Sequence, residues 1–197
     1  MFEQKYPILL ASGSPRRREY LERFGLQFEV ASADIDESVP LGEAPMDYVR
    51  RMVVNKAEAF DLSPDKVVIT ADTLVLVEGE ILGKPEDPSQ VFPMLTQLNG
   101  KTHQVITGYG IFFGDQQRLR EVVTKVRLKK NSVELLKAYA QTSEPLDKAG
   151  SYSIQGLGTL LVDTIDGSYN NVVGLPVEEL FSDLIQMGLL SPKGEEF

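Results

Sequence analysis

A run of small residues and arginines near the N-terminus has the composition of an anion-binding turn. Residues 12–18 read Ser-Gly-Ser-Pro-Arg-Arg-Arg, directly after a short apolar stretch. Small residues let backbone N–H groups approach a ligand, and the start of a helix is positively polarised. Arginines in a first helical turn oppose the helix dipole, at about 0.3–1 kcal/mol each where exposed. Their placement therefore favours a bound polyanion such as phosphate, with a solvated basic helix start as the alternative.

A second candidate is an acidic residue inside an otherwise apolar run. Asp72, followed by Thr73, lies within residues 67–77, which are rich in β-branched side chains. A carboxylate buried there must pair, bind a metal or shift its pKa. A functional site and a simple salt bridge or exposed strand end are the two alternatives. Because side chains alternate along a strand, Asp72 and Thr73 should point to opposite faces unless the strand ends or bulges.

Three further polar features are spread along the chain. Residues 34–37 form an acidic loop that ends in Glu37, and carboxylate oxygens hold Mg²⁺ or Mn²⁺ while leaving positions for substrate phosphates. Lys84 lies between a glycine and a proline that fix its backbone, and lysines neutralise phosphates as point charges. Lys56, taken alone, is more typical of a surface lysine whose stem packs on apolar neighbours.

His103 is the single histidine of the chain. An imidazole is the usual general base near neutral pH. We nevertheless expect His103 to have a structural, hydrogen-bonding role, because Asp72 is better placed to act on an attacking water. The chain has no cysteine, which excludes disulfides, cysteine-ligated zinc and thiol nucleophiles. Any metal site is therefore expected to use oxygen ligands.

These residues require a scaffold, and the apolar patterning predicts a mixed α/β one. Two long strands around a polar turn at 114–117 indicate an antiparallel hairpin. A mixed sheet with helices packed around it is the most economical architecture. The predicted strands span residues 8–11, 27–32, 67–77, 105–113, 119–129, 152–154 and 159–165. The predicted helices span residues 15–25, 45–60, 89–98 and 132–141, and a last one starts near 176.

Length and charge narrow the class of protein. A chain of 197 residues fits one compact α/β domain, or one domain folded into two lobes around a cleft. The hydrophobic fraction of 42% and the charged fraction of 25% are typical of soluble globular proteins. A formal net charge of −9 disfavours nucleic acid and anionic membranes as partners. No apolar run approaches the ~18–20 residues of a membrane span, so we expect a cytoplasmic protein.

The motifs, taken in order, resemble those of the Maf family. They are Ser-Gly-Ser-Pro-Arg-Arg at 12–17, Ala-Asp-Thr at 71–73, Gly-Lys-Pro at 83–85, Gly-Lys-Thr-His-Gln-Val at 100–105 and Asp-Lys-Ala-Gly-Ser-Tyr-Ser-Ile-Gln-Gly at 147–156. Each alone could arise by chance, whereas the ordered set is specific. The resemblance implies one Maf domain over residues 1–197. It also implies a Maf-like, ITPase-like α/β fold: a mixed sheet flanked by helices, elongated, with a deep central cleft.

The resemblance implies a metal-dependent nucleoside triphosphate pyrophosphatase, which releases the monophosphate and diphosphate. The branch it resembles acts on dTTP and UTP, with CTP and modified pyrimidine nucleotides left open. Asp72 matches the proton acceptor of the family, and Glu37 with Asp72 matches the positions associated with a divalent cation, Mg²⁺ or Mn²⁺. The phosphate-handling positions are matched by Ser12, Arg16, Arg17, Lys56 and Lys84. The specificity positions are matched by Arg16, Thr73 and Gln155, whose amide offers a pyrimidine both a donor and an acceptor.

Two alternative functions remain open. The early Gly-Ser loop also superficially matches that of sugar-nucleotide synthases, nucleotidyltransferases that release diphosphate and require an acceptor substrate. The Maf name is also attached to a nucleotide-responsive regulator of cell division, which would bind nucleotide without turnover. A homodimer is typical of what the resemblance suggests.

Overall fold

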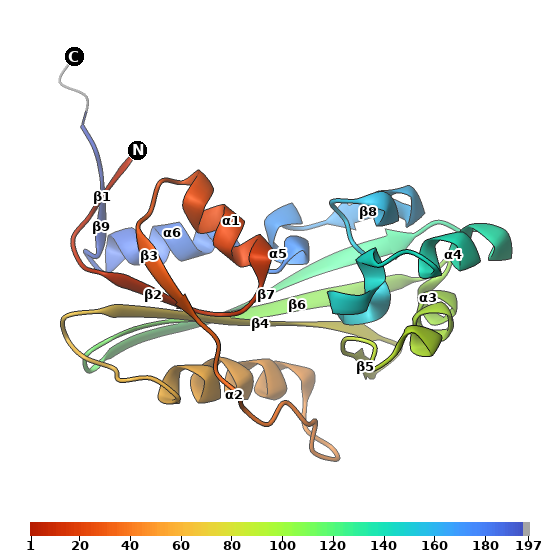
Figure 1. The fold of residues 1–197 in the computed structure, drawn as a ribbon, viewed down its shortest axis with the longest axis horizontal. Helices are drawn as coiled ribbons and strands as arrows, with labels where there is room; N and C mark the ends of the chain where they lie inside the picture. The colour runs from red at the N-terminus through yellow and green to blue at the C-terminus, as the bar shows by residue number, and fades with distance from the viewer. Residues whose placement is uncertain (195–197) are drawn as a thin grey trace. The chain divides into compact units, whose positions relative to one another are not determined.

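A computed structural model describes residues 1–194 as a mixed α/β fold (Figure 1). Its strands are β1 (Phe2–Gln4), β2 (Ile8–Ala11), β3 (Phe28–Ala31), β4 (Val67–Val77), β5 (Glu80–Leu82), β6 (Thr102–Phe113), β7 (Gln116–Leu128), β8 (Val162–Asp166) and β9 (Leu190–Pro192). Its α-helices are α1 (Pro15–Arg23), α2 (Pro45–Glu58), α3 (Val91–Leu98), α4 (Val133–Ala140), α5 (Tyr169–Val173) and α6 (Val177–Gln186). Its 3₁₀ helices are η1 (Pro88–Gln90), η2 (Glu144–Asp147), η3 (Ala149–Ser151) and η4 (Leu157–Leu161).

The strands form one large mixed sheet and one small sheet. The seven-stranded sheet has the order β3-β2-β4-β6-β7-β8, and β5 pairs with β4. β2 runs parallel to both β3 and β4, whereas the β4–β5 and β7–β8 pairs are antiparallel. The predicted fold class, a mixed sheet flanked by helices, is therefore confirmed. The elongated outline and the deep cleft stay predictions.

The chain separates into two compact units. The first comprises residues 1–72, residues 107–121 and the chain from 174 on, and the second comprises residues 73–106 and 122–173. Residues 195–197 of the predicted domain lie outside the described residues. Among residues 1–194, no helix is long and apolar enough to cross a membrane.

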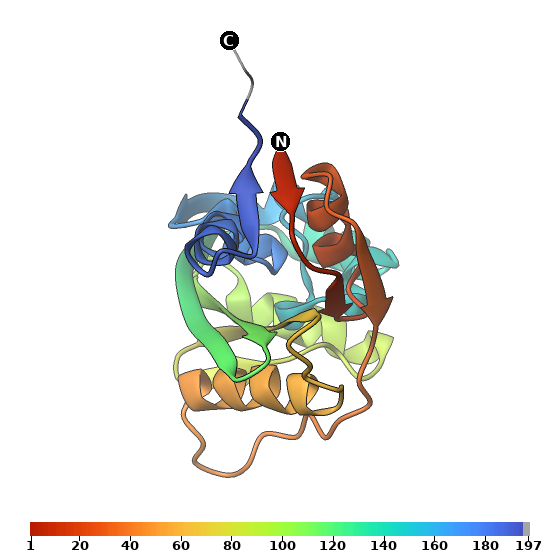
Figure 2. The ribbon, with the colours of Figure 1, turned by 90° about the vertical axis from the view of Figure 1, so that its left-hand side faces the viewer.

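The first unit contains the parallel strands and the helices that cover them. In Figures 1 and 2, α2 lies on one side of these strands, and α1 and α6 lie on the other. The apolar stripe of α2 is buried at Tyr48, Val49, Met52, Val53 and Ala57. A Cβ at Gly108 would lie 2.3 Å from a Val49 methyl group, so β6 requires a glycine where α2 crosses it.

The chain ends of the first unit meet in a small sheet that the sequence patterning did not predict. β1 pairs antiparallel with β9, from Phe2 opposite Pro192 to Gln4 opposite Leu190. Figure 2 shows these two strands side by side. Each strand has three residues, too short for an alternating pattern to be recognised in the sequence.

The second unit has its own apolar core. Strand residues such as Val75 and Val126 pack there with Leu95 of α3 and Leu136 of α4, and each is almost fully buried. This burial is the main contribution to the stability of the unit. Among the predicted helices, 89–98 corresponds to η1 and α3, and 132–141 corresponds to α4 with Ser132 as its N-cap.

Two predicted strands in the second unit are wrong in whole or in part. Residues 152–154 are not a strand, and the first part of the predicted strand 159–165 is the 3₁₀ helix η4, with β8 beginning only at Val162. Gly150 adopts a positive φ of 69°, which turns the chain out of an extended path. The apolar residues of this region are buried by turns instead of by sheet pairing.

Candidate active site

The turn after β2 lies beside β4 because the two strands are parallel and in register. Ala11 pairs with Thr70. The next residues of the two segments, Ser12 and Ala71, are therefore neighbours. Arg17 joins them: its Nη1 donates to Ser12 Oγ at 3.0 Å and to the Ala71 carbonyl at 2.8 Å. Its Nε donates to the Gly174 carbonyl at 2.8 Å. Arg17 therefore has a structural role, although the arginine run was interpreted as favouring a ligand over structure.

The three consecutive arginines have three different environments. Arg17 is buried at 9% exposure, and burial lowers its pKa to about 10, against the opposing effect of Asp72. It is thus still charged at neutral pH. Arg18 lies on the surface in an ion pair with Glu22 at 2.7 Å. Arg16 is half-buried, between the buried Arg17 and the exposed Arg18 in accessibility. The predicted phosphate-handling roles of Ser12, Arg16 and Arg17 stay predictions.

A compact charge cluster brings together three of the predicted site residues. Nζ of Lys56, on α2, lies 2.6 Å from Oδ1 of Asp72, on β4, and 2.9 Å from Oε1 of Glu37. The Lys56 and Asp72 side chains are only 12% and 14% exposed, whereas Glu37 is 50% exposed. The interpretation of Lys56, taken alone, as a surface lysine is wrong. The helix positions it inward because Tyr48, Met52 and Lys56 are four residues apart and share one face.

The loop that carries Glu37 is attached to α2 by two residues that the sequence interpretation did not assign to the site. The hydroxyl of Tyr48 donates to the Glu37 carbonyl at 3.0 Å. Arg51 donates from Nε and Nη2 to the two carboxylate oxygens of Glu43, both at 2.7 Å, and from Nη2 to the Ser38 carbonyl at 2.9 Å. Burial raises the pKa of Tyr48 to about 12, so its hydroxyl keeps its proton. Backbone carbonyl partners leave no signal in a single sequence.

The second unit contains the other predicted residues, Thr73, Lys84 and Gln155. Thr73 is half-buried in β4, which runs without interruption through residues 67–77. Lys84 and Gln155 are exposed. The N–H of Gly150 donates to the Gly83 carbonyl at 3.0 Å, so the loop of Lys84 is hydrogen-bonded to the motif that leads to Gln155.

His103 has the environment expected for a structural histidine. It is buried at 2% exposure, and its Nε2 is hydrogen-bonded to the Tyr152 hydroxyl at 2.8 Å. Burial lowers the pKa of the imidazole to about 4. His103 is therefore neutral at physiological pH.

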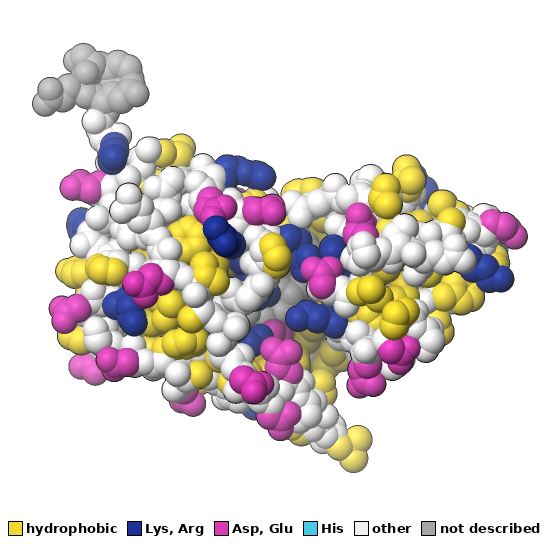
Figure 3. All heavy atoms as spheres, viewed as in Figure 1, with side chains coloured by type: hydrophobic (Ala, Val, Ile, Leu, Met, Phe, Trp, Pro, Cys, Tyr) yellow, Lys and Arg dark blue, Asp and Glu magenta, His cyan; other side chains and the backbone are white. Residues whose placement is uncertain are grey.

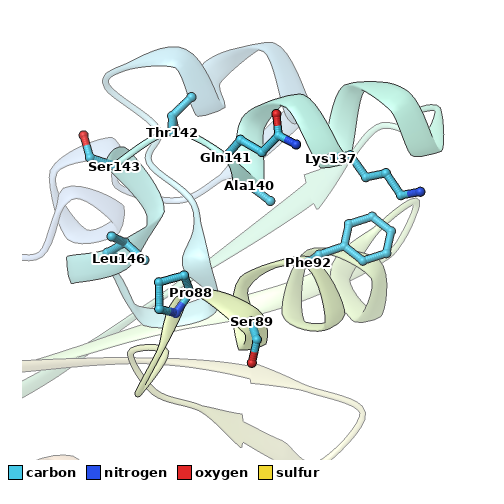
Figure 4. Close-up of a pocket in the computed structure, with 9 residues that line it drawn as sticks. All are labelled: Pro88, Ser89, Phe92, Lys137, Ala140, Gln141, Thr142, Ser143 and Leu146. Carbon is cyan, nitrogen blue, oxygen red and sulfur yellow. The ribbon is translucent and has the colours of Figure 1, made fainter.

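The second unit also has an open pocket of about 690 Å³ on its surface (Figure 4). Its walls come from η1 and the start of α3 on one side, with Pro88 and Phe92, and from the end of α4 on the other. None of the predicted site residues is among those that line it. The pocket is therefore not assigned to the candidate active site.

The charge cluster has the donor chemistry of a small divalent-cation site. Within residues 1–194 no group of three or more His, Asp or Glu side chains could hold a metal ion. Asp72 and Glu37 nevertheless both contact one ammonium, so the two carboxylates face the same small positive group. Mg²⁺ is usually held by one or two carboxylates, with substrate phosphates and water completing its shell. These two carboxylates fit a cation that binds together with a polyphosphate.

Comparison with solved structures defines the fold class. The chain is similar to the Ham1 protein of Staphylococcus aureus, with a TM-score of 0.53 and 14% sequence identity, over 92% of this chain and 99% of that one. At this identity the similarity shows the fold alone, an ITPase-like mixed α/β fold. The family is shown by the sequence: residues 7–187 match the model of the Maf-like protein family. The chain belongs to this family.

Curated relatives agree with the family assignment. A dTTP/UTP pyrophosphatase of Geobacter metallireducens is 47% identical, over 93% of this chain and 97% of the relative. Two others of the same name, from Geobacter sulfurreducens and Symbiobacterium thermophilum, are 44% and 42% identical, over 95% and 92% of this chain and 100% and 94% of the relatives. Membership of the Maf family and the prediction that the chain is an enzyme are confirmed.

Proposed function

We propose that this chain is a nucleoside triphosphate pyrophosphatase that hydrolyses dTTP and UTP to the monophosphate and diphosphate. The observation that carries the proposal is the Lys56 ammonium in contact with both Asp72 and Glu37. This charge cluster lies in the same unit as the turn at residues 12–17. The relatives named dTTP/UTP pyrophosphatase support the substrate class.

Asp72 is the proposed proton acceptor. It removes a proton from the water that attacks the α phosphorus, with diphosphate as the leaving group. The ion pair with Lys56, at 2.6 Å, holds one carboxylate oxygen, Oδ1, in a fixed position. The orientation of the acceptor is thus set before the nucleotide binds.

Cations around the turn at residues 12–17 are proposed to stabilise the charge that develops on the phosphate oxygens. In the first unit, Arg16 and the backbone N–H groups at the start of α1 are the candidates for this role, and they adjoin the buried Arg17 in the sequence. The family resemblance gives the same role to Lys84, which belongs to the second unit. Fixed charges of this kind are a large source of rate enhancement, because they need no rearrangement during the reaction.

Asp72 and Glu37 are the residues that would hold a divalent cation, Mg²⁺ or Mn²⁺. A bound cation neutralises phosphate charge and polarises the phosphoryl oxygens. Lys56 keeps the two carboxylates together when no cation is bound, since it contacts both. Removal of the cation by a chelator should therefore abolish turnover without unfolding the first unit.

Base selection is assigned to Arg16, Thr73 and Gln155 by the family resemblance. Gln155 is exposed, so its amide is accessible to a ligand. Its amide can donate to and accept from the edge of thymine or uracil, but it also fits cytosine. CTP and modified pyrimidine nucleotides belong to the same proposal.

Product analysis tests the proposal. Purified protein is incubated with Mg²⁺ or Mn²⁺ and each of dTTP, UTP, CTP, GTP and 7-methyl-GTP, and products are separated by ion exchange. We expect monophosphate and diphosphate from dTTP and UTP, with kcat reduced about 10²- to 10⁴-fold by Asp72→Asn. Asp61→Asn, the same change at an exposed carboxylate of the first unit, should leave kcat unchanged.

The same experiment separates the alternatives. A nucleotidyltransferase would release diphosphate only when an acceptor such as a sugar phosphate is added. A regulator without catalysis would bind nucleotide and release no product. Orthophosphate as the product, or no turnover, would contradict the proposed function.

A further inference from the structure

The segment that carries Gln155 is held by hydrogen bonds to side chains instead of by a sheet. Residues 153–156 lie between η3 and η4, and residues 157 and 158 begin η4. None of them belongs to a strand. The Gln155 N–H donates to Ser153 Oγ at 3.2 Å, a contact within the segment itself. A contact of this kind shapes the turn but does not attach it to the rest of the unit.

Glu144, at the start of η2, attaches one end of this segment. Its two carboxylate oxygens accept the N–H groups of Leu157, at 2.8 Å, and Gly158, at 2.9 Å. Both donors follow Gln155 by two or three residues. The position of the backbone after Gln155 is therefore defined by one carboxylate.

Tyr139, at the end of α4, attaches the other end. Its hydroxyl accepts the Ser153 N–H at 3.0 Å and donates to Glu144 Oε1 at 2.9 Å. Ser153 precedes Gln155 by two residues, so the backbone is held on both sides of Gln155. Tyr139 is 5% exposed, and this burial fixes the hydroxyl in turn.

Two glycines show how closely the segment is wrapped around these side chains. A Cβ at Gly156 would lie 1.9 Å from Glu144 Oε2. A Cβ at Gly158 would lie 2.5 Å from the Ser153 carbonyl oxygen and 2.7 Å from the Tyr139 hydroxyl. No real Cβ lies so close to these atoms, so the arrangement requires glycine at both positions.

Tyr139 and Glu144 are themselves held by hydrogen bonds to their backbone carbonyls. Figure 4 shows the chain that leads from α4 through Gln141, Thr142 and Ser143 toward Leu146, the stretch that contains Glu144. The Thr142 N–H and hydroxyl both donate to the Tyr139 carbonyl, at 3.0 and 2.8 Å. Lys148 Nζ donates to the Glu144 carbonyl at 2.7 Å.

Charge favours the same arrangement. Burial acts to raise the pKa of Glu144, but hydrogen bonds from Gly158, Leu157 and Tyr139 outweigh it and lower the pKa. Glu144 is therefore a carboxylate at neutral pH and accepts all three donors. Burial, with the adjacent Glu144, raises the pKa of Tyr139, so its hydroxyl keeps the proton that it donates.

We propose that Glu144, acting with Tyr139, is a positioning residue for base selection: it holds the backbone on both sides of Gln155 so that the amide presents a fixed donor and acceptor to a pyrimidine. The inference rests on the proposed function for the role of Gln155. A preorganised amide rejects the wrong base better than a mobile one, because a mobile amide can adapt to several hydrogen-bonding patterns.

The test compares Glu144→Gln with Glu134→Gln, the same change at an exposed residue of α4. The amide introduced by Glu144→Gln has a donor group in place of one acceptor oxygen, so it cannot accept all three hydrogen bonds. We expect the preference for dTTP over GTP, measured as the ratio of kcat/KM values, to fall by about tenfold or more. The KM for dTTP should rise while kcat changes little. Glu134→Gln should behave as the unchanged protein.

A second measurement does not depend on activity. Amide hydrogen exchange of peptides that cover residues 153–158 should be faster in Glu144→Gln and unchanged in Glu134→Gln. Tyr139→Phe removes only the hydroxyl, with its contacts to Ser153 and Glu144, and it should also make exchange faster. This variant takes the place of Glu144→Gln in the test if Glu144→Gln does not fold.

The outcomes separate the inference from the proposed function. Faster exchange with an unchanged base preference would overturn base selection by Glu144, and unchanged exchange would overturn the positioning role. A fall in kcat with no change in preference would indicate a general structural effect and would also overturn it. If the unchanged protein hydrolyses no nucleoside triphosphate, the proposed function itself fails, whatever the exchange shows.

Discussion

At the residue scale, a buried and a largely buried cation organise the first unit in different ways. Arg17 donates to Ser12 and to the carbonyls of Ala71 and Gly174, and so joins three segments distant in sequence. Lys56 contacts the carboxylates of Asp72 and Glu37. The planar guanidinium suits several acceptors at fixed angles, whereas the ammonium acts as a point charge between two anions.

The first prediction concerns Arg17. Arg17→Lys should lower the free energy of unfolding by about 1–3 kcal/mol, because one ammonium cannot replace the fork and leaves a buried carbonyl without its donor. Arg18→Lys is the matched control, since Arg18 forms an exposed pair with Glu22 and such pairs contribute little. Urea denaturation measures both. Equal stability of the two variants would show that the Arg17 contacts do not matter.

The second prediction is a pH dependence of stability that arises from His103. Its pKa is about 4 in the folded chain and 6.5 as the ordinary value. Between these values the unfolded chain binds a proton that the folded chain does not, so stability falls as pH decreases from 6.5 toward 4. The contribution is about 1.4 kcal/mol per pH unit at most.

His103→Gln removes this titration. Urea denaturation between pH 6.5 and about pH 5, the window that lies between the two pKa values, should therefore show a shallower decline of stability for the variant than for the unchanged protein. The comparison uses the slope with pH, so a constant loss of stability in the variant does not affect it. Parallel slopes would mean that His103 is accessible to protons in the folded state.

At the element scale, α2 positions the acidic loop as well as the ammonium. Tyr48 and Arg51 hold the loop through the carbonyls of Glu37 and Ser38, and Lys56 holds the Glu37 carboxylate. These three residues belong to one helix. A helix is stiffer than a loop, so it can define the position of a mobile carboxylate.

The third prediction tests this attachment. Arg51→Met removes the fork to Glu43 and the bond to Ser38 while keeping an unbranched side chain. Because the loop can then move, kcat for dTTP should fall by about 10- to 100-fold, with a change in melting temperature of only a few degrees. Arg50→Met, which breaks the pair between Arg50 and Glu121 at the surface, should keep the full kcat. A normal kcat in Arg51→Met would exclude the proposed anchoring.

The sequence allowed prediction of the elements that carry their own local signals. Residues 67–77 were predicted as a strand with the observed bounds, because β-branched residues favour extended backbone. The strand predicted at 152–154 is wrong, because Glu144 and Tyr139 hold that region in turns through contacts distant in sequence. For the same reason the inward position of Lys56 on its helix was missed, because its partners lie on a loop and on a strand. Spacing within one helix does not reveal such partners.

At the scale of the whole molecule, family and charge describe the chain consistently. It belongs to the Maf-like protein family over residues 7–187, and its formal net charge is −9. On the face of the described residues drawn in Figure 3, acidic and basic side chains are interspersed. The predictions that the chain does not bind nucleic acid, that it forms a homodimer and that it is cytoplasmic stay predictions.

The central claim is that water attacks the α phosphorus, with Asp72 as its proton acceptor. Hydrolysis of dTTP in ¹⁸O-labelled water, followed by mass spectrometry of the separated products, tests it most directly. The account predicts label in the monophosphate, none in the diphosphate, and labelled product formed about 10²- to 10⁴-fold more slowly with Asp72→Asn. Label in the diphosphate, or labelled orthophosphate together with dTDP, would place the attack on another phosphorus and contradict the account.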